Sequence, residues 1–106
     1  MNLNDYQQKA LETAIYPEGT QKGLEYTILG LASEAGEVAG KYAKWIRDGG
    51  EYPMDDIAKE LGDVLWMLAC CAWEHGYSLE EVAQMNLDKL SSRKERGVLQ
   101  GSGDDR

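Results

Sequence analysis

Four carboxylate side chains are the residues of this sequence best able to do chemistry, and they come as two pairs. Glu34 and Glu37 form the first pair, and Glu60 and Asp63 form the second, each with the spacing i, i+3. Residues three apart share one face of a helix, so each pair presents two carboxylates together. Four such groups that converge repel one another unless a cation lies among them. Mg²⁺ prefers oxygen ligands and Mn²⁺ accepts them, so the pattern predicts a metal site without Cys or His ligands.

Bound Mg²⁺ usually keeps several waters and combines a few carboxylates with substrate phosphates, which implies a phosphate ester or anhydride as substrate. A polar stripe near the C-terminus suits phosphate oxygens, or the carboxylates themselves. Its members, spaced 3, 4 and 3, are Asn86, Lys89, Arg93 and Arg96. A second interpretation stays open. In a chain with 19 acidic residues, the pairs and the stripe are also what ordinary solvated helix faces look like.

Four helices must position these residues, and hydrophobic periodicity predicts them at 5–15, 20–47, 53–76 and 78–97. The two acidic pairs lie on the second and third helices. The short connection at Gly49 and Gly50 favours antiparallel packing of these helices, which lets the pairs converge at the bundle margin. No segment alternates like a strand. We therefore expect one all-α domain over 1–97, most simply a four-helix bundle, followed by a Gly- and Asp-rich tail at 98–106.

Composition excludes several classes of function. A formal net charge of -8 argues against nucleic acid as a ligand, because such binders need clustered positive charge. His75 is the single histidine, which rules out multi-His zinc sites. The adjacent Cys70 and Cys71 suit a reducing compartment, and no apolar run is as long as a membrane span. These features predict a cytoplasmic protein without a membrane partner. At 106 residues its core is thin, which favours association.

Several other residues are expected to have structural roles. Tyr42 and Trp45 fall on the apolar stripe of the second helix and are expected in the core. Trp66 points away from the core side of the third helix, which favours a subunit interface. Gly36 and Gly62 lie inside the two acidic motifs, where a missing side chain allows close helix approach or leaves room for a ligand.

In their context, the acidic pairs resemble the hallmark of the MazG-type all-α nucleoside triphosphate pyrophosphohydrolases. That hallmark is E-x-x-E, a spacer and E-x-x-D, and this chain has Glu34-Ala-Gly-Glu37 and Glu60-Leu-Gly-Asp63. The surrounding segments that also match are 30–38, 44–48, 60–68 and 86–93. The closing residues 96–97 and 101–106 resemble the endings of small single-domain members, including many from phages. The resemblance covers essentially the whole chain.

The resemblance implies Mg²⁺-dependent hydrolysis of a (deoxy)nucleoside triphosphate between the α- and β-phosphates, which releases a nucleoside monophosphate and pyrophosphate. By position, Glu34, Glu37, Glu60 and Asp63 would hold the metal. One of them, or a water that they position, would activate the attacking water. The residues implied to contact phosphate or sugar, or to neutralise the acidic cluster, are Lys44, Asn86, Lys89 and Arg93. Related folds are dimers or tetramers, so a homodimer or homotetramer would complete the bundle, with the tail near the active site.

One position departs from the family pattern. Small members often carry a tyrosine after Leu-Trp, where this chain has Met67. Because Met67 lies in line with Glu60 and Asp63, it is expected to line the base pocket. Two alternatives to the leading function stay open: a sister pyrophosphohydrolase acting on phosphoribosyl-ATP or dUTP, and a non-catalytic helical module that binds nucleotides. The complete set of four repelling carboxylates argues for the enzyme.

Overall fold

The computed structural model describes residues 1–106, and every regular element in it is a helix. In chain order the elements are α1 (Leu3–Leu11), α2 (Gln21–Asp48), α3 (Met54–Glu74) and α4 (Leu79–Glu95). The predicted all-α class with four helices is confirmed. None of these helices combines the length and the apolar content that crossing a membrane requires.

Capping groups and glycines set the ends of the long helices. The Thr20 side chain accepts a hydrogen bond from the backbone N–H three residues on, at the start of α2. Ser78 and Glu81 form the predicted capping box of α4. Gly49 and Gly50 connect α2 to α3 with φ angles of 71° and 90°, which favour glycine. The chain therefore reverses abruptly between the two helices that carry the acidic pairs.

The first helix is shorter than the predicted range 5–15. The N–H groups of Glu12, Thr13 and Ala14 bond to carbonyls three residues back, as in a turn. Ile15 follows in the connection to α2 and is 99% exposed, so it does not join the apolar stripe. The predicted end at residue 15 is wrong, because the chain leaves the helix at Leu11.

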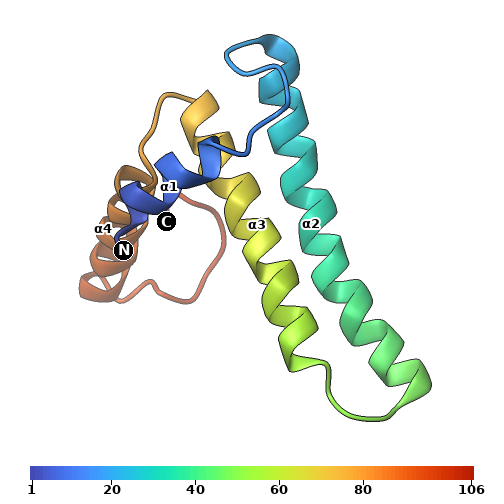
Figure 1. The fold of residues 1–106 in the computed structure, drawn as a ribbon. Coiled ribbons are helices and arrows are strands. Elements are labelled where there is room, and N and C mark those ends of the chain that lie inside the picture. The colour runs from blue at the N-terminus through green and yellow to red at the C-terminus, as the bar shows by residue number, and fades with distance from the viewer.

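The helices form a long antiparallel hairpin with two shorter helices attached to one side. Figure 1 shows α2 and α3 side by side, with α1 and α4 across α3 from α2. Helix α2 packs against α3 alone among the helices, whereas α3 also contacts α1 and α4. One chain therefore leaves much of the α2 surface without a neighbouring helix.

The buried core lies where α1 and α4 meet α3. Ala10, Ala69 and Leu79 form its apolar cluster. Beside them, Gln7 is 1% exposed. Its amide N–H donates to the carbonyls of Ala69 at 3.0 Å and Tyr77 at 3.2 Å, and its oxygen accepts from the Leu79 N–H at 3.0 Å. The one buried amide is fully bonded and ties α1 to α3 and to the start of α4.

Trp66 packs inside the chain rather than pointing to a partner. Its indole N–H donates to the Ala10 carbonyl at 3.1 Å and to the Thr13 hydroxyl at 2.8 Å, and its ring meets Tyr16 edge-on. Within one chain, Trp66 is therefore held by α1 and by Tyr16 and is only partly exposed. Helix α1 covers the side of α3 that the periodicity of α3 alone marks as outward.

The glycines of the acidic motifs do not bring α2 and α3 together. A methyl group at Gly36 or Gly62 would meet nothing within 4 Å, so the expectation of close helix approach there is wrong. Close approaches occur instead at Gly30, which faces Met67 of α3, and at Gly23, in the first turn of α2. A methyl group at that position would lie 2.5 Å from the carbonyl oxygen of Pro17. The connection from α1 therefore presses directly on the start of α2.

We predict that Gly23→Ala lowers the free energy of unfolding by about 1–3 kcal/mol, because the added methyl group must displace backbone. Gly40→Ala is the matched control on the same helix, since its methyl group would meet nothing within 4 Å. That variant should gain up to about 1 kcal/mol from helix propensity. Urea unfolding followed by circular dichroism measures both changes. Equal stability of the two variants would contradict the assigned contact.

Candidate active site

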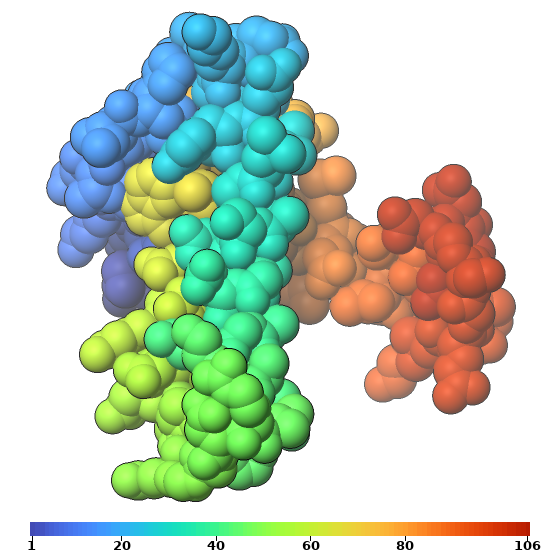
Figure 2. All heavy atoms as spheres, turned by 90° about the vertical axis from the view of Figure 1, so that its right-hand side faces the viewer, coloured from blue at the N-terminus to red at the C-terminus, as the bar shows by residue number.

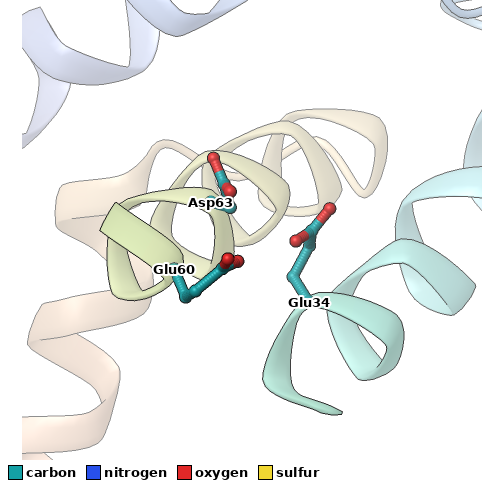
Figure 3. A group of neighbouring side chains, drawn as sticks. All are labelled: Glu34, Glu60 and Asp63. Carbon is teal, nitrogen blue, oxygen red and sulfur yellow. The ribbon is translucent and has the colours of Figure 1, made fainter. Parts of the chain in front are cut away.

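Three of the four predicted carboxylates meet between α2 and α3. Glu34 comes from α2, and Glu60 and Asp63 come from α3. One oxygen from each lies within 4.8 Å of the other two. Figure 3 shows the three side chains around a shared space between the helices. Glu34 and Glu60 are half-buried, whereas Asp63 is exposed, so the cluster opens to solvent on the Asp63 side.

The cluster lacks a compensating positive charge from the protein. No lysine or arginine forms an ion pair with Glu34, Glu60 or Asp63, and no side-chain hydrogen bond reaches them. The pKa of Glu34 is raised above its ordinary value of 4.5, first by partial burial and then by the negative charges of Asp63, Glu60 and Glu37. An oxygen-only donor set with uncompensated charge fits a hard divalent cation such as Mg²⁺ or Mn²⁺.

Glu37 lies one turn beyond Glu34 on α2 and remains outside the group of three. Its side chain is exposed, although its charge contributes to the raised pKa of Glu34. The structure therefore places Glu37 at the edge of the cluster rather than inside it.

Lys44 is separated from the carboxylates along α2. Ten residues of helix put it about 15 Å from Glu34. There it lines a shallow hollow at the α2–α3 turn, together with Trp45 and Asp56. Tyr42 is 46% exposed, and its ring lies 5.6 Å from the ring of Trp45 in a tilted arrangement. The expectation of a core position is therefore wrong for Tyr42, and Trp45 is only half-buried, because no other helix covers this end of α2.

The basic stripe of α4 does not reach the carboxylates within one chain. Asn86 is exposed, Lys89 is partly exposed and Arg93 is buried. Helix α4 packs on α1 and α3 and makes no contact with α2. Figure 2 shows the C-terminal half of α4 and the tail standing clear of the α2–α3 hairpin. The hydrogen bonds and ion pairs of the tail, residues 98–106, go to α4 and to the tail itself.

Residues 22–98 match the model of the MazG nucleotide pyrophosphohydrolase domain, a match that spans well over half of the chain and all four predicted carboxylates. The chain belongs to the MazG family. It is also similar to the Gene 37 protein of Mycobacterium phage L5, with 46% identity over 114 residues that cover 100% of both chains. No solved structure matches.

Membership in the family establishes the class of reaction. The MazG domain is a hydrolase that acts on nucleotide anhydrides, and it implies a nucleoside triphosphate as substrate. The family generally depends on a divalent metal, which agrees with the acidic cluster between α2 and α3. The sequence resemblance is thereby confirmed.

Met67 does not line an open pocket in the MazG domain. Only 7% of its surface is exposed, because its side chain packs against α2 at Gly30. A methyl group at Gly30 would lie 2.5 Å from the Met67 thioether. Within this chain, Met67 is therefore buried between α3 and α2 and does not line a base pocket as the sequence predicts. Met67 closes the α2–α3 interface one turn beyond Asp63 and gives the cluster an apolar neighbour.

Tyr6 of α1 is a neighbour of the site that the sequence pattern did not single out. Partial burial raises the pKa of its hydroxyl, and Cys70 and Asp63 raise it further. Tyr6 also lines an apolar hollow with Leu3 and Leu65. The periodicity of α1 marks Tyr6 only as a core residue, so nothing in the sequence links it to the acidic motifs. Only the packing of α1 across α3 brings Tyr6 near Asp63.

The raised pKa of Glu34 makes a testable prediction for stability without metal. Well below pH 4.5 the residue is mainly neutral in both the folded and the unfolded chain. As the pH rises through the higher folded pKa, the folded chain holds the proton longer, so the free energy of unfolding falls. Glu34→Gln should therefore raise the melting temperature at pH 7 in EDTA by about 2–6 °C, and by much less at pH 4.

The matched control for this prediction is Glu51→Gln, an exposed acid in the α2–α3 turn that forms no ion pair. It removes the same charge from the chain but none from the cluster. Differential scanning calorimetry at both pH values separates the two variants. Equal shifts in the two variants would show that net charge, rather than repulsion inside the cluster, governs stability.

Proposed function

We propose that this MazG domain hydrolyses (deoxy)nucleoside triphosphates between the α- and β-phosphates, with Mg²⁺ as the metal and Mn²⁺ as a substitute. Glu34, Glu60 and Asp63 would hold the metal, with Glu37 beside them. The observation that carries the proposal is the group of three carboxylates within 4.8 Å, without any positive partner, in a chain of this family.

The proposed reaction adds the oxygen of water to phosphorus and breaks the bridging anhydride bond, which leaves a nucleoside monophosphate and pyrophosphate. A bound metal would offset charge on the phosphate oxygens and lower the pKa of a bound water. The carboxylates of the chain orient that water and accept its proton. The opening beside the exposed Asp63 gives the triphosphate access to the cluster.

We further propose that the active form is a homodimer or homotetramer. Only 11 of the 106 residues are buried in one chain, which leaves a large apolar surface uncovered. The exposed aliphatic side chains of α2 and α3 include Ile28, Leu29, Ile46, Leu61 and Leu65. A second copy that covers this surface would also bring the cations of its α4 toward the carboxylates, which the α4 of the same chain does not reach. Asn86, Lys89 and Arg93 would then reach the triphosphate bound to the other copy.

A pyrophosphate-release assay tests the proposed reaction. The panel contains the canonical and damaged dNTPs and NTPs, dUTP and phosphoribosyl-ATP, each with Mg²⁺, with Mn²⁺ and with EDTA. We expect pyrophosphate and the monophosphate in equal amounts, in the metal-containing arms only. Preference for phosphoribosyl-ATP or dUTP would select the sister activity. Nucleotide binding without release of pyrophosphate would overturn the proposal in favour of a non-catalytic module.

A further inference from the structure

The C-terminal tail, residues 98–106, is closed on itself by its last side chain. The Arg106 guanidinium donates hydrogen bonds to the carbonyls of Gly103 at 2.7 Å, Leu99 at 2.9 Å and Val98 at 3.1 Å. Gly103 has a φ of 85°, which lets the chain turn back toward α4. The tail thus forms an ordered ring of backbone around one arginine, although it contains almost no buried apolar surface.

Two arginines of the α4 end attach this ring to the helix. Arg93 donates to the carbonyls of Asp104 at 2.7 Å and Gly103 at 3.3 Å. Arg96 donates to the backbone oxygen of Arg106 at 2.8 Å. Arg93 is 5% exposed, which is unusual for an arginine and shows how closely the tail covers it. The ring is therefore docked on the basic stripe of α4, at the end that stands clear of the hairpin (Figure 2).

The Asp104 carboxylate occupies the position where an outside anion would meet that stripe. One of its oxygens lies 3.3 Å from the Lys89 ammonium and 3.6 Å from the Arg93 guanidinium. The Asp104 side chain is 85% exposed, so this pairing faces the solvent, as a phosphate arriving from solution would. The Nε atom of Arg93 is buried without any partner. The tail therefore leaves part of the guanidinium unsatisfied, and the one tail carboxylate that pairs with these cations, Asp104, is weakly held, as exposed ion pairs generally are.

We propose that Asp104 is an internal competitor for phosphate, so that the phosphates of a nucleotide or pyrophosphate must displace it before they bind Lys89 and Arg93. This inference rests on the proposed function, in which these cations contact the triphosphate. A phosphate chain offers several oxygens and more charge than one carboxylate, so it satisfies both cations at once. The docked tail keeps them paired until that ligand arrives.

The test measures binding of inorganic pyrophosphate to the full chain in EDTA by isothermal titration calorimetry, without hydrolysis. Asp104→Asn should bind pyrophosphate about three- to tenfold more tightly than the native chain. Asp105→Asn is the matched control, because it removes the same charge from the adjacent residue, whose side chain forms no ion pair or hydrogen bond. It should change the affinity by less than about twofold. Equal affinities for the two variants, or weaker binding by Asp104→Asn, would overturn the proposal.

Two further measurements separate this inference from the proposed function. Arg106→Ala opens the ring without changing Asp104 and should also tighten pyrophosphate binding. Unchanged or weaker binding would count against the docked tail as the competitor. Lys89→Ala should cancel the gain of Asp104→Asn, and a gain that persists without Lys89 would contradict the assigned pair.

In turnover, Asp104→Asn should lower the KM for the nucleotide rather than change kcat. If no nucleotide is hydrolysed, the proposed function fails, but the pyrophosphate titration still decides the role of Asp104.

Discussion

Asp63→Asn is expected to reduce pyrophosphate release by about a hundred- to thousandfold, with the helical circular dichroism signal unchanged. Asp63 is the exposed member of the three-carboxylate group, so its replacement disturbs no packed contact. The amide keeps the shape of the side chain but removes one negative charge from the group. The loss should therefore appear in kcat and in the dependence on metal concentration, rather than in the stability of the fold.

The matched control is Asp55→Asn, which changes the same residue type on the same helix. Asp55 is exposed in the first turn of α3, two turns before the cluster, and its activity should stay within about twofold of the native chain. Steady-state pyrophosphate release at saturating Mg²⁺ compares the two variants. Full activity in a folded Asp63→Asn protein would exclude the cluster between α2 and α3 as the metal site.

The second large effect concerns the copy that supplies Lys89. We expect Glu60→Gln and Lys89→Ala each to lose most activity alone and to regain about a quarter of the native activity when their subunits are mixed and exchanged. In a mixed dimer, one site combines the intact carboxylates of one copy with the intact Lys89 of the other. The other site carries both changes. Half of a random mixture consists of such dimers, which gives the expected fraction.

Mixing Glu60→Gln with Asp63→Asn is the control, because both changes damage the same group of carboxylates. If each copy uses the other copy's α4, this mixture leaves every site with a damaged cluster and stays inactive. Absence of recovery in the test mixture would place Lys89 with the carboxylates of its own chain, whereas recovery in the control would show that the carboxylates of one site come from two copies. Sedimentation of the mixtures verifies that the subunits have exchanged.

Local spacing was sufficient to predict the helices and the core of the site. The apolar periodicity of α2 and α3 and the Ser78–Glu81 capping box depend on residues a few positions apart, which interact within one helix. The same holds for the acidic pairs, since the i, i+3 spacing alone puts Glu60 and Asp63 on one face. The short glycine connection then brings Glu34 of α2 against them.

Contacts between distant parts of the chain decided the remaining features. The periodicity of α3 places Trp66 on the outward side of that helix, yet α1 covers it. Tyr42 lies on the side that the periodicity of its helix marks as inward, yet no helix of the same chain covers it and it is 46% exposed. Periodicity identifies an apolar face but not the element that packs on it, and that choice sets which residues are buried.

The sequence by itself determined the helical class, the MazG motif and the carboxylates that can hold a metal. Only the tertiary structure decided that Glu37 lies at the edge of the group, that Met67 is closed off against α2, and that Asp104 covers Lys89 and Arg93. The first set depends on spacing along one helix, and the order of residues fixes that spacing directly. The second depends on the distances between elements, which follow from how side chains far apart in the chain pack together.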